Sequence, residues 1–189
     1  MVFGRTYSYL HEFRQRLKLP RPGTVDHCVE MALNIVERPQ RVIAIWVHTA
    51  MNPPQEEFDA ACSQIIALRN RVPRVLSRLR TLIISDGGAP NIFQRTRHNV
   101  EALEGTRVPT SLISCSLGSS VARGIVNAVM WTNPAFKAFG PAQWRAALEY
   151  VDLQDERNLV ADIAVAARQL SKPLKTLDMV GAAMRTSAA

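Results

Sequence analysis

Three apolar segments, at 42–48, 81–86 and 110–115, alternate with segments of helical periodicity and most constrain what this chain can fold into. The first begins Val42-Ile43-Ala44-Ile45-Trp46-Val47 and has no polar residue in that run. A strand without a polar side is typical of the centre of a sheet that is covered on both faces. Strands that alternate with helices predict a sheet with a parallel core and right-handed crossovers.

The segment before the first of these strands fits two structures. Alternating apolar positions indicate a half-buried strand, at Val29, Met31, Leu33 and Ile35. A helix would use a different set, at Cys28, Val29, Ala32, Leu33 and Val36. The turn-like Arg38-Pro39-Gln40 favours the strand, as the first half of a hairpin. With a weak edge strand at 136–139, the pattern predicts an α/β fold with a mixed five-stranded sheet.

Helices are predicted between these strands, starting at Asn52-Pro53-Pro54-Gln55, at Asn91 and at Ser119 or Ser120, and another is predicted after the last strand, starting at Pro141. Glu56 and Glu57 complement the positive end of the first helix dipole, and Asn91 with Gln94 resembles a capping box. The buried stripe expected in the first helix is Phe58, Ala61, Cys62, Ile65 and Leu68. In the second helix it is Phe93, Thr96, Val100 and Leu103.

Helical segments without strands lie at both ends of the chain. The sequence predicts an N-terminal amphipathic helix and linker at 1–25, an α/β domain at 26–153 and a C-terminal helical extension at 154–189. Apolar faces outside a complete core need something to cover them. We therefore expect these faces to contact another protein or a second copy of the chain, through Leu10, Phe13, Leu17, Leu159, Ile163 and Leu177.

Length and cysteine content narrow the class of protein. A chain of 189 residues fits one domain with appended helices, and no apolar run approaches the ~18 residues that a bilayer-spanning helix needs. The start of the sequence lacks the apolar core of a secretory signal. Cys28, Cys62 and Cys115 are odd in number and widely spaced, so no disulfide framework is expected. These features predict a cytoplasmic protein.

The chain is basic, with 23 Lys+Arg against 16 Asp+Glu and a net charge of +7. Part of the excess is an arginine cluster with no acid within it, at Arg69, Arg71, Arg74, Arg78 and Arg80. A basic surface attracts phosphates, acidic lipids or an acidic protein, and it also simply keeps a protein soluble. No aromatic residue that could stack on bases lies within the cluster, which disfavours nucleic acid as a partner.

Three stretches, HTAMNPPQEEF, ISDGGAPNIFQR and NAVMWTNPAFKAFGPAQWRAALEYV, look like uncharacterised bacterial proteins with a STAS-like domain. The order of elements from Asp26 to Leu153 likewise resembles the STAS domain, the SpoIIAA-like fold of anti-sigma-factor antagonists and stressosome proteins. The resemblance implies a protein-binding or small-ligand module more than an enzyme. In the antagonists, an Asp at a strand end precedes a phosphorylatable Ser or Thr. Here Asp86 precedes Gly87 and Gly88, so that hydroxyl is missing.

The carboxyl ends of the parallel strands predict a ligand site, because ligands of such sheets bind there. Helix N-termini and glycines at this edge favour an anion such as a phosphate or a carboxylate. The candidate ligand-binding residues are Asp86, Gly87, Gly88, Gln94, Arg95, Ser119 and Arg123. Helix caps and turns explain the same residue types.

Catalytic and metal sites are poorly supported. Ser116, His48 and Asp86 could be named as nucleophile, base and orienting group, but the G-x-S-x-G elbow is absent and no second carboxylate supports acid–base catalysis. The four histidines, His11, His27, His48 and His98, have unrelated spacings and form no ligand set. The sequence therefore predicts no enzyme, no metal and no cofactor.

The predicted function is a non-enzymatic, cytoplasmic protein-interaction, regulatory or scaffold module whose terminal helices are the contact elements. A second hypothesis is a domain that binds a small anionic ligand at the strand ends. An enzyme that uses the same pocket is a third. Weak nucleic-acid binding through the arginine cluster is the fourth.

Overall fold

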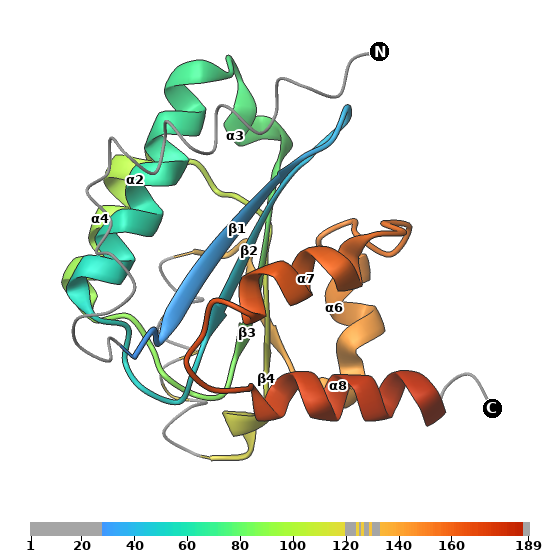
Figure 1. The fold of residues 1–189 in the computed structure, drawn as a ribbon. Coiled ribbons are helices and arrows are strands. Elements are labelled where there is room, and N and C mark those ends of the chain that lie inside the picture. The colour runs from blue at the N-terminus through green and yellow to red at the C-terminus, as the bar shows by residue number, and fades with distance from the viewer. Residues whose placement is uncertain (1–27, 120–123, 125, 127–128, 130–132, 187–189) are drawn as a thin grey trace, which may run out of the picture.

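The centre of the molecule is a five-stranded sheet in the order β1-β2-β3-β4-β5 (Figure 1). A computed structural model describes residues 28–119, 124, 126, 129 and 133–186. The strands are β1 (Met31–Glu37), β2 (Val42–His48), β3 (Leu79–Ser85), β4 (Thr110–Ser114) and β5 (Phe136–Phe139). β1 and β2 form an antiparallel hairpin, while β2 to β5 run parallel. The predicted mixed sheet is thus confirmed, with the hairpin at one edge and β5 at the other.

Helices cover both faces of the sheet, as the apolar pattern of β2 predicts. All seven residues of β2 are buried. Val42, Ala44 and Trp46 belong to the hydrophobic cluster of one face. The alternate residues Ile43, Ile45 and Val47 belong to the cluster of the other face. This division follows from the two-residue period of a strand, which points successive side chains to opposite sides.

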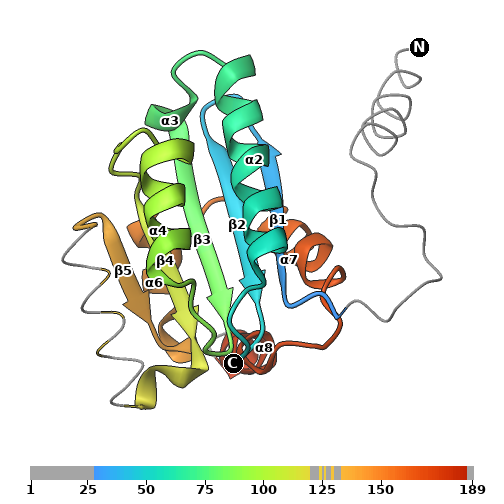
Figure 2. The same ribbon diagram turned by 90° about the vertical axis from the view of Figure 1, so that its left-hand side faces the viewer.

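The first face is covered by α2 (Gln55–Arg71), α3 (Val75–Arg78) and α4 (Ile92–Arg97), which continues as a π-helix, η1 (His98–Ala102). Figure 2 shows α2 and α4 lying side by side in front of the strands. The expected stripe of α2 is confirmed, because Phe58, Ala61, Cys62, Ile65 and Leu68 are all buried. Glu56 and Glu57 in its first turn and arginines in its last turn complement the helix dipole.

The inward face of α4 and η1 differs from the prediction. The capping box of Asn91 and Gln94 is confirmed, and Leu103 is buried. However, Phe93 is 79% exposed, Val100 is 62% exposed and Thr96 is exposed as well, so the prediction that these three are buried was wrong. A π-helical turn adds a residue to the helix and changes which side chains follow its inner face. Gln94 and Ala102 are buried in their place.

The second face is covered by the C-terminal helices η3 (Pro141–Gln143), α6 (Trp144–Tyr150), α7 (Leu159–Ala167) and α8 (Lys175–Thr186) (Figures 1 and 2). Leu159 is 4% exposed, and Ile163 and Leu177 pack against the same cluster. The sequence predicted these three side chains as contacts with another protein. The structure instead uses them to cover its own sheet, because the apolar side chains of that face would otherwise be exposed to water.

Several predicted features lie outside the described residues. These are the N-terminal helix with Leu10, Phe13 and Leu17, and Arg123 in the segment between β4 and β5.

The three cysteines are free thiols, and burial raises the pKa of Cys62 to about 12. None of the helices in the described ranges combines the length and apolarity that crossing a bilayer requires.

Candidate functional site

The carboxyl ends of β3 and β4, where the sequence predicts a ligand, are occupied by the N-terminus of α8. The Asp86 carboxylate accepts hydrogen bonds from the backbone N–H of Lys175 at 2.9 Å and of Thr176 at 2.8 Å. The Thr176 hydroxyl donates to the Ser85 carbonyl at 2.8 Å and accepts from the Cys115 N–H at 3.1 Å. Asp86 therefore caps a helix of its own chain, and its role in ligand binding stays a prediction.

The two glycines after Asp86 form a tight turn against the loop that follows β2. Gly87 has φ +140°, a conformation that other residues rarely adopt. A Cβ on Gly88 would lie 1.8 Å from the Met51 carbonyl oxygen, and the Gly88 N–H donates to the Thr49 carbonyl at 3.1 Å. The sequence predicts that a ligand approaches the backbone closely at these glycines. At Gly88, the backbone of the loop after β2 makes this close approach instead.

Gln94 is also used within the fold. Its side-chain oxygen accepts from the Asn91 N–H at 2.8 Å, and its amide nitrogen donates to the Pro53 carbonyl at 3.0 Å. These bonds satisfy a side chain that is only 2% exposed. Ser119 is exposed and follows the 3-10 helix η2 (Cys115–Gly118). Among the predicted ligand residues that the structure describes, Arg95 and Gly88 line the cavity considered next.

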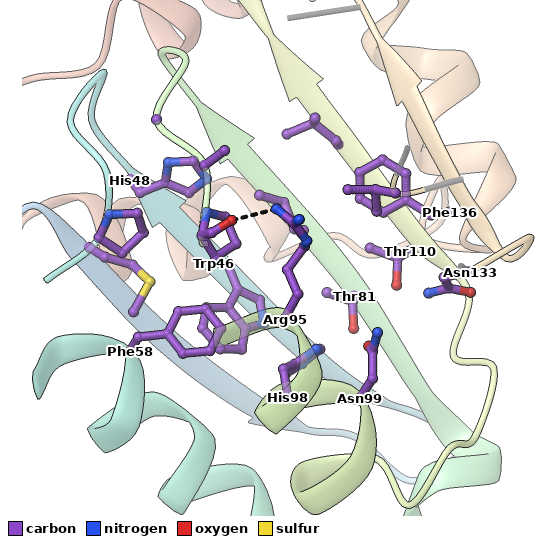
Figure 3. A pocket seen from close by; sticks show the side chains of 18 of the residues that line it. Trp46, His48, Phe58, Thr81, Arg95, His98, Asn99, Thr110, Asn133 and Phe136 are labelled. Atoms are coloured by element: carbon purple, nitrogen blue, oxygen red, sulfur yellow. Dashed lines mark hydrogen bonds between the residues drawn. The ribbon is translucent and has the colours of Figure 1, made fainter. Parts of the chain in front are cut away.

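A cavity of about 140 Å³ lies between the first face of the sheet and the helices α4 and η1 (Figure 3). β2, β3, β4 and β5 contribute its floor, through Trp46, Ile83, Leu112 and Phe136 among others. Phe58 of α2 and His98 of η1 form an aromatic cluster with Trp46, with ring centroids 5.4–6.4 Å apart. The walls are therefore mainly apolar, with a few polar groups along them.

Arg95 is the only charged side chain among the described residues that line this cavity. Its Nη1 donates to the Pro90 carbonyl at 2.7 Å, which anchors the guanidinium. Figure 3 shows the side chain extending from α4 across the strands, between Trp46 and His48 on one side and Thr110 and Phe136 on the other. Within the described part of the chain, no carboxylate forms a salt bridge with it. The guanidinium keeps further N–H donors for another acceptor.

Two buried polar atoms in residues that line the cavity lack partners. In the ranges that the structure describes, the indole Nε1–H of Trp46 and the Nε2 of His98 are buried and form no hydrogen bond. Trp46 is 5% exposed, so water does not satisfy its N–H from the surface. A buried donor without a partner costs about 1–3 kcal/mol, and such groups mark places where a ligand or an ordered water completes the structure.

Both histidines of the cavity are uncharged at neutral pH. Burial lowers the pKa of His48 and of His98 to about 4. His48 Nδ1 lies 3.0 Å from the Ser85 hydroxyl, which is itself buried and also accepts the Gly87 N–H at 2.9 Å. Arg95 therefore supplies the positive charge of the cavity lining at neutral pH.

The three residues named for a hydrolytic site do not assemble one. The ring of His48 pairs with Ser85, whereas the Ser116 hydroxyl pairs with the Ser114 hydroxyl at 2.9 Å. The Asp86 carboxylate is occupied by α8. The sequence did not reveal the His48–Ser85 pair, because the parallel register that places the ends of β2 and β3 together is a tertiary feature. No cluster of three or more metal-ligating side chains occurs within the described residues.

The arginine cluster bonds largely to its own chain. Arg69 forms an ion pair with Glu104 at 3.4 Å, and Arg71 forms one with Glu37. Arg78 donates to the carbonyls of Arg38 and Pro39, both at 2.9 Å. These bonds hold the end of α2 and the start of β3 to neighbouring loops. They give the cluster a structural role beside its charge.

Comparison with known proteins finds a likeness to a solved structure. No family model matches the sequence, and no curated protein matches it. The structure is similar to an uncharacterized protein of the DUF3478 family with a SpoIIAA-like fold from Shewanella loihica PV-4, with a TM-score of 0.46 and 12% identity. The match covers 68% of this chain and 99% of that one. The strand order and directions of this chain establish its mixed α/β sheet.

The sequence predicts Trp46 in a strand that is covered on both faces, and it assigns His98 no role. Trp46 is indeed buried, but its position over a cavity follows from the spacing between the sheet and α4. One sequence signal was available, because a tryptophan in a strand that is apolar on both faces carries an N–H that needs a partner. Of the predicted ligand-binding residues, Arg95 and Gly88 line this cavity, and the predicted anion site itself stays a prediction.

Proposed function

We propose that this chain is a small-molecule-binding domain whose ligand occupies the cavity between the sheet and α4–η1. The observation that carries the proposal is a mainly apolar cavity lined by Arg95, which forms no salt bridge within the described residues, and by Trp46, whose buried indole N–H has no partner among them. Pockets that bind small molecules combine apolar walls with a few convergent polar groups. A mostly apolar interior has no structural need for these groups, whereas a ligand would satisfy them.

The proposal fits the volume of the cavity. A cavity of about 150 Å³ is known to hold benzene, so about 140 Å³ accommodates a single ring or a short branched chain. The aromatic cluster of Trp46, Phe58 and His98 offers ring faces and edges on which such a group can pack. Binding without catalysis is the simplest function for this arrangement, because His48 and Ser116 have other partners.

The test is binding of toluene, a neutral probe that fits the cavity. We expect toluene to raise the melting temperature of the wild-type protein and to shift the indole N–H resonance of Trp46, which a Trp46→Phe variant assigns. Leu112→Phe enlarges a side chain that lines the cavity and should lower the affinity for toluene at least about tenfold. Val100→Phe makes a comparable change at an exposed position of η1 and should leave binding unchanged. Absence of any effect of toluene and of charged single-ring probes on the wild type would refute the proposal.

A second candidate function is the protein-interaction role that the sequence predicts, now at a different surface. Ile92 and Phe93 at the start of α4 are 61% and 79% exposed, and Val100 lies on the same helical segment. Exposed apolar side chains that gather on one element favour a contact with another protein. Self-association is the form that is simplest to test. Light scattering at increasing concentration should give a rising mass for the wild type and a constant mass for Phe93→Ser, and a monomeric wild type would exclude it.

A further inference from the structure

We infer that the ligand of this cavity is a small apolar carboxylic acid, bound as its anion, with the carboxylate on Arg95 and the hydrocarbon body against the sheet. The inference rests on the proposed function and names the chemical class of its ligand. It is carried by the placement of one guanidinium inside a cavity whose other described lining residues are uncharged at neutral pH.

The sign of the charge excludes cations and disfavours neutral ligands. A guanidinium that is half-buried among apolar side chains gains most from an anionic partner, because burial strengthens electrostatic attraction. A cation would be repelled, since no acidic side chain lines the described part of the cavity. A neutral ligand would leave the guanidinium without a counter-ion and would take it further out of water, which is unfavourable.

The geometry selects a carboxylate among anions. Nη1 of Arg95 is held by the Pro90 carbonyl at 2.7 Å, so the guanidinium keeps a fixed direction into the cavity. Its planar array of N–H donors matches the two oxygens of a carboxylate. A phosphate would bring up to two charges to one cation, in a cavity where most surfaces are apolar and cannot solvate the excess. A singly charged carboxylate is neutralised by Arg95 alone.

The remaining polar atoms refine the class. The Nε1–H of Trp46 is a donor only, and it lacks a partner within the described residues. A ligand oxygen, either of the carboxylate or of a neighbouring hydroxyl or carbonyl, would accept this hydrogen bond. The body of the ligand would pack against the apolar side chains Met31, Phe58, Ile83, Leu112 and Phe136, which favours a ring or a branched hydrocarbon. Thr81, Asn99, Thr110 and Asn133 also line the cavity and could contact a polar substituent on it.

The experiment compares benzoate, benzamide and benzamidine, which share one ring and differ in charge. Titrations followed by the Trp46 indole resonance measure the affinity of each for the full-length wild-type protein. A charge-assisted hydrogen bond contributes enough free energy that we expect benzoate to bind at least about tenfold more tightly than benzamide. Benzamidine should not bind. Equal affinities, or tighter binding of benzamide or benzamidine, would overturn the inference.

Two arginine variants assign the preference to Arg95. Arg95→Met removes the charge inside the cavity and should abolish the preference for benzoate. Arg107→Met removes the same charge from an exposed position outside the cavity and should preserve that preference. Retention of the benzoate preference in Arg95→Met would overturn the assignment. If this variant does not fold, Arg95→Lys keeps the charge but not the planar array, and an unchanged benzoate affinity would count against the geometry.

The result separates this inference from the proposed function. If toluene and benzamide bind and benzoate does not, the cavity is a binding site for neutral molecules and the carboxylate inference is wrong. If neither toluene nor any of the three charged or neutral ring probes binds, the proposed function fails and the inference fails with it.

Discussion

Replacing Asp86 by alanine should weaken the attachment of the N-terminus of α8 to the end of β3, where the Thr176 hydroxyl remains bonded to the Ser85 carbonyl. The Asp86 carboxylate accepts two backbone N–H groups at the start of this helix, from Lys175 and Thr176. The first N–H groups of a helix have no partner within it, and their positive partial charge favours a carboxylate. The variant loses both acceptors at once and leaves the Thr176 N–H part-buried without its partner.

The expected cost follows from the exposure of the two bonds. A hydrogen bond to a charged group contributes about 1.5–3 kcal/mol when well buried. The bond to Lys175 is exposed and the bond to Thr176 is part-buried, so we take about 1 kcal/mol for each. The sum is about 2 kcal/mol of the free energy of unfolding. For a chain of this size, that loss lowers the melting temperature by about 4–8 °C.

Thermal and urea unfolding, followed by circular dichroism, measure the loss. Hydrogen exchange locates it, because the amides of α8 should lose protection before those of β2 and β3. Asp155→Ala is the matched control, since Asp155 is an exposed aspartate in a C-terminal loop, and it should change stability by less than about 0.5 kcal/mol. Equal stability and equal protection of α8 in the two variants would refute the capping role of Asp86.

Two other predictions concern the buried histidines and the glycine turn. Burial lowers the pKa of His48 and His98 from 6.5 to about 4, so between these values the unfolded chain binds more protons and stability falls as the pH drops. Between pH 7 and pH 5, the free energy of unfolding should fall by about 2 kcal/mol for each histidine. Urea unfolding at the two pH values measures this change, and equal stability at both would contradict the prediction. Gly88→Ala should destabilise the fold by about 3 kcal/mol, because its Cβ meets the Met51 carbonyl, which belongs to the backbone. Gly118→Ala, whose Cβ meets nothing within 4 Å, should be near neutral, and equal melting temperatures of the two variants would disprove the steric argument.

The elements that the sequence predicts best are those whose pattern is local. β2 is apolar at six successive positions, and the stripe of α2 repeats at helical spacing, so both follow from side-chain periodicity alone. The exposure of Phe93 and Val100 does not follow in this way. Val100 lies within the π-helical turn of η1, which forms where α4 passes over the cavity, whereas Phe93 precedes that turn and its exposure follows from the way the buried Gln94 orients the start of α4. The hydrophobic periodicity of the sequence does not predict where a helix contains the extra residue of a π-helical turn.

The candidate site is predicted only in part, for a related reason. The polar residues after β3 were correctly singled out as a group, but sequence cannot say whether a polar side chain has its partner in a ligand or in the same chain. Asp86 meets α8 about ninety residues later in the sequence, and Gln94 meets the loop before α2. Arg95 is the exception, because within the described residues its bond to Pro90 uses only part of its donor capacity.

The handedness of the crossovers explains why the C-terminal helices belong to the fold. The strands follow one another across the sheet in chain order, so right-handed connections place α2 and α4 on the same face. The opposite face carries Ile45, Leu82, Ile84 and Ile113, each at most 2% exposed. The described helices α2, α3 and η1 contribute to the cluster of the first face, and α6, α7 and α8, which follow β5, cover the opposite one. A boundary after residue 153 would therefore cut through one hydrophobic cluster, and a sheet that is apolar on both faces already requires helices from beyond its last strand.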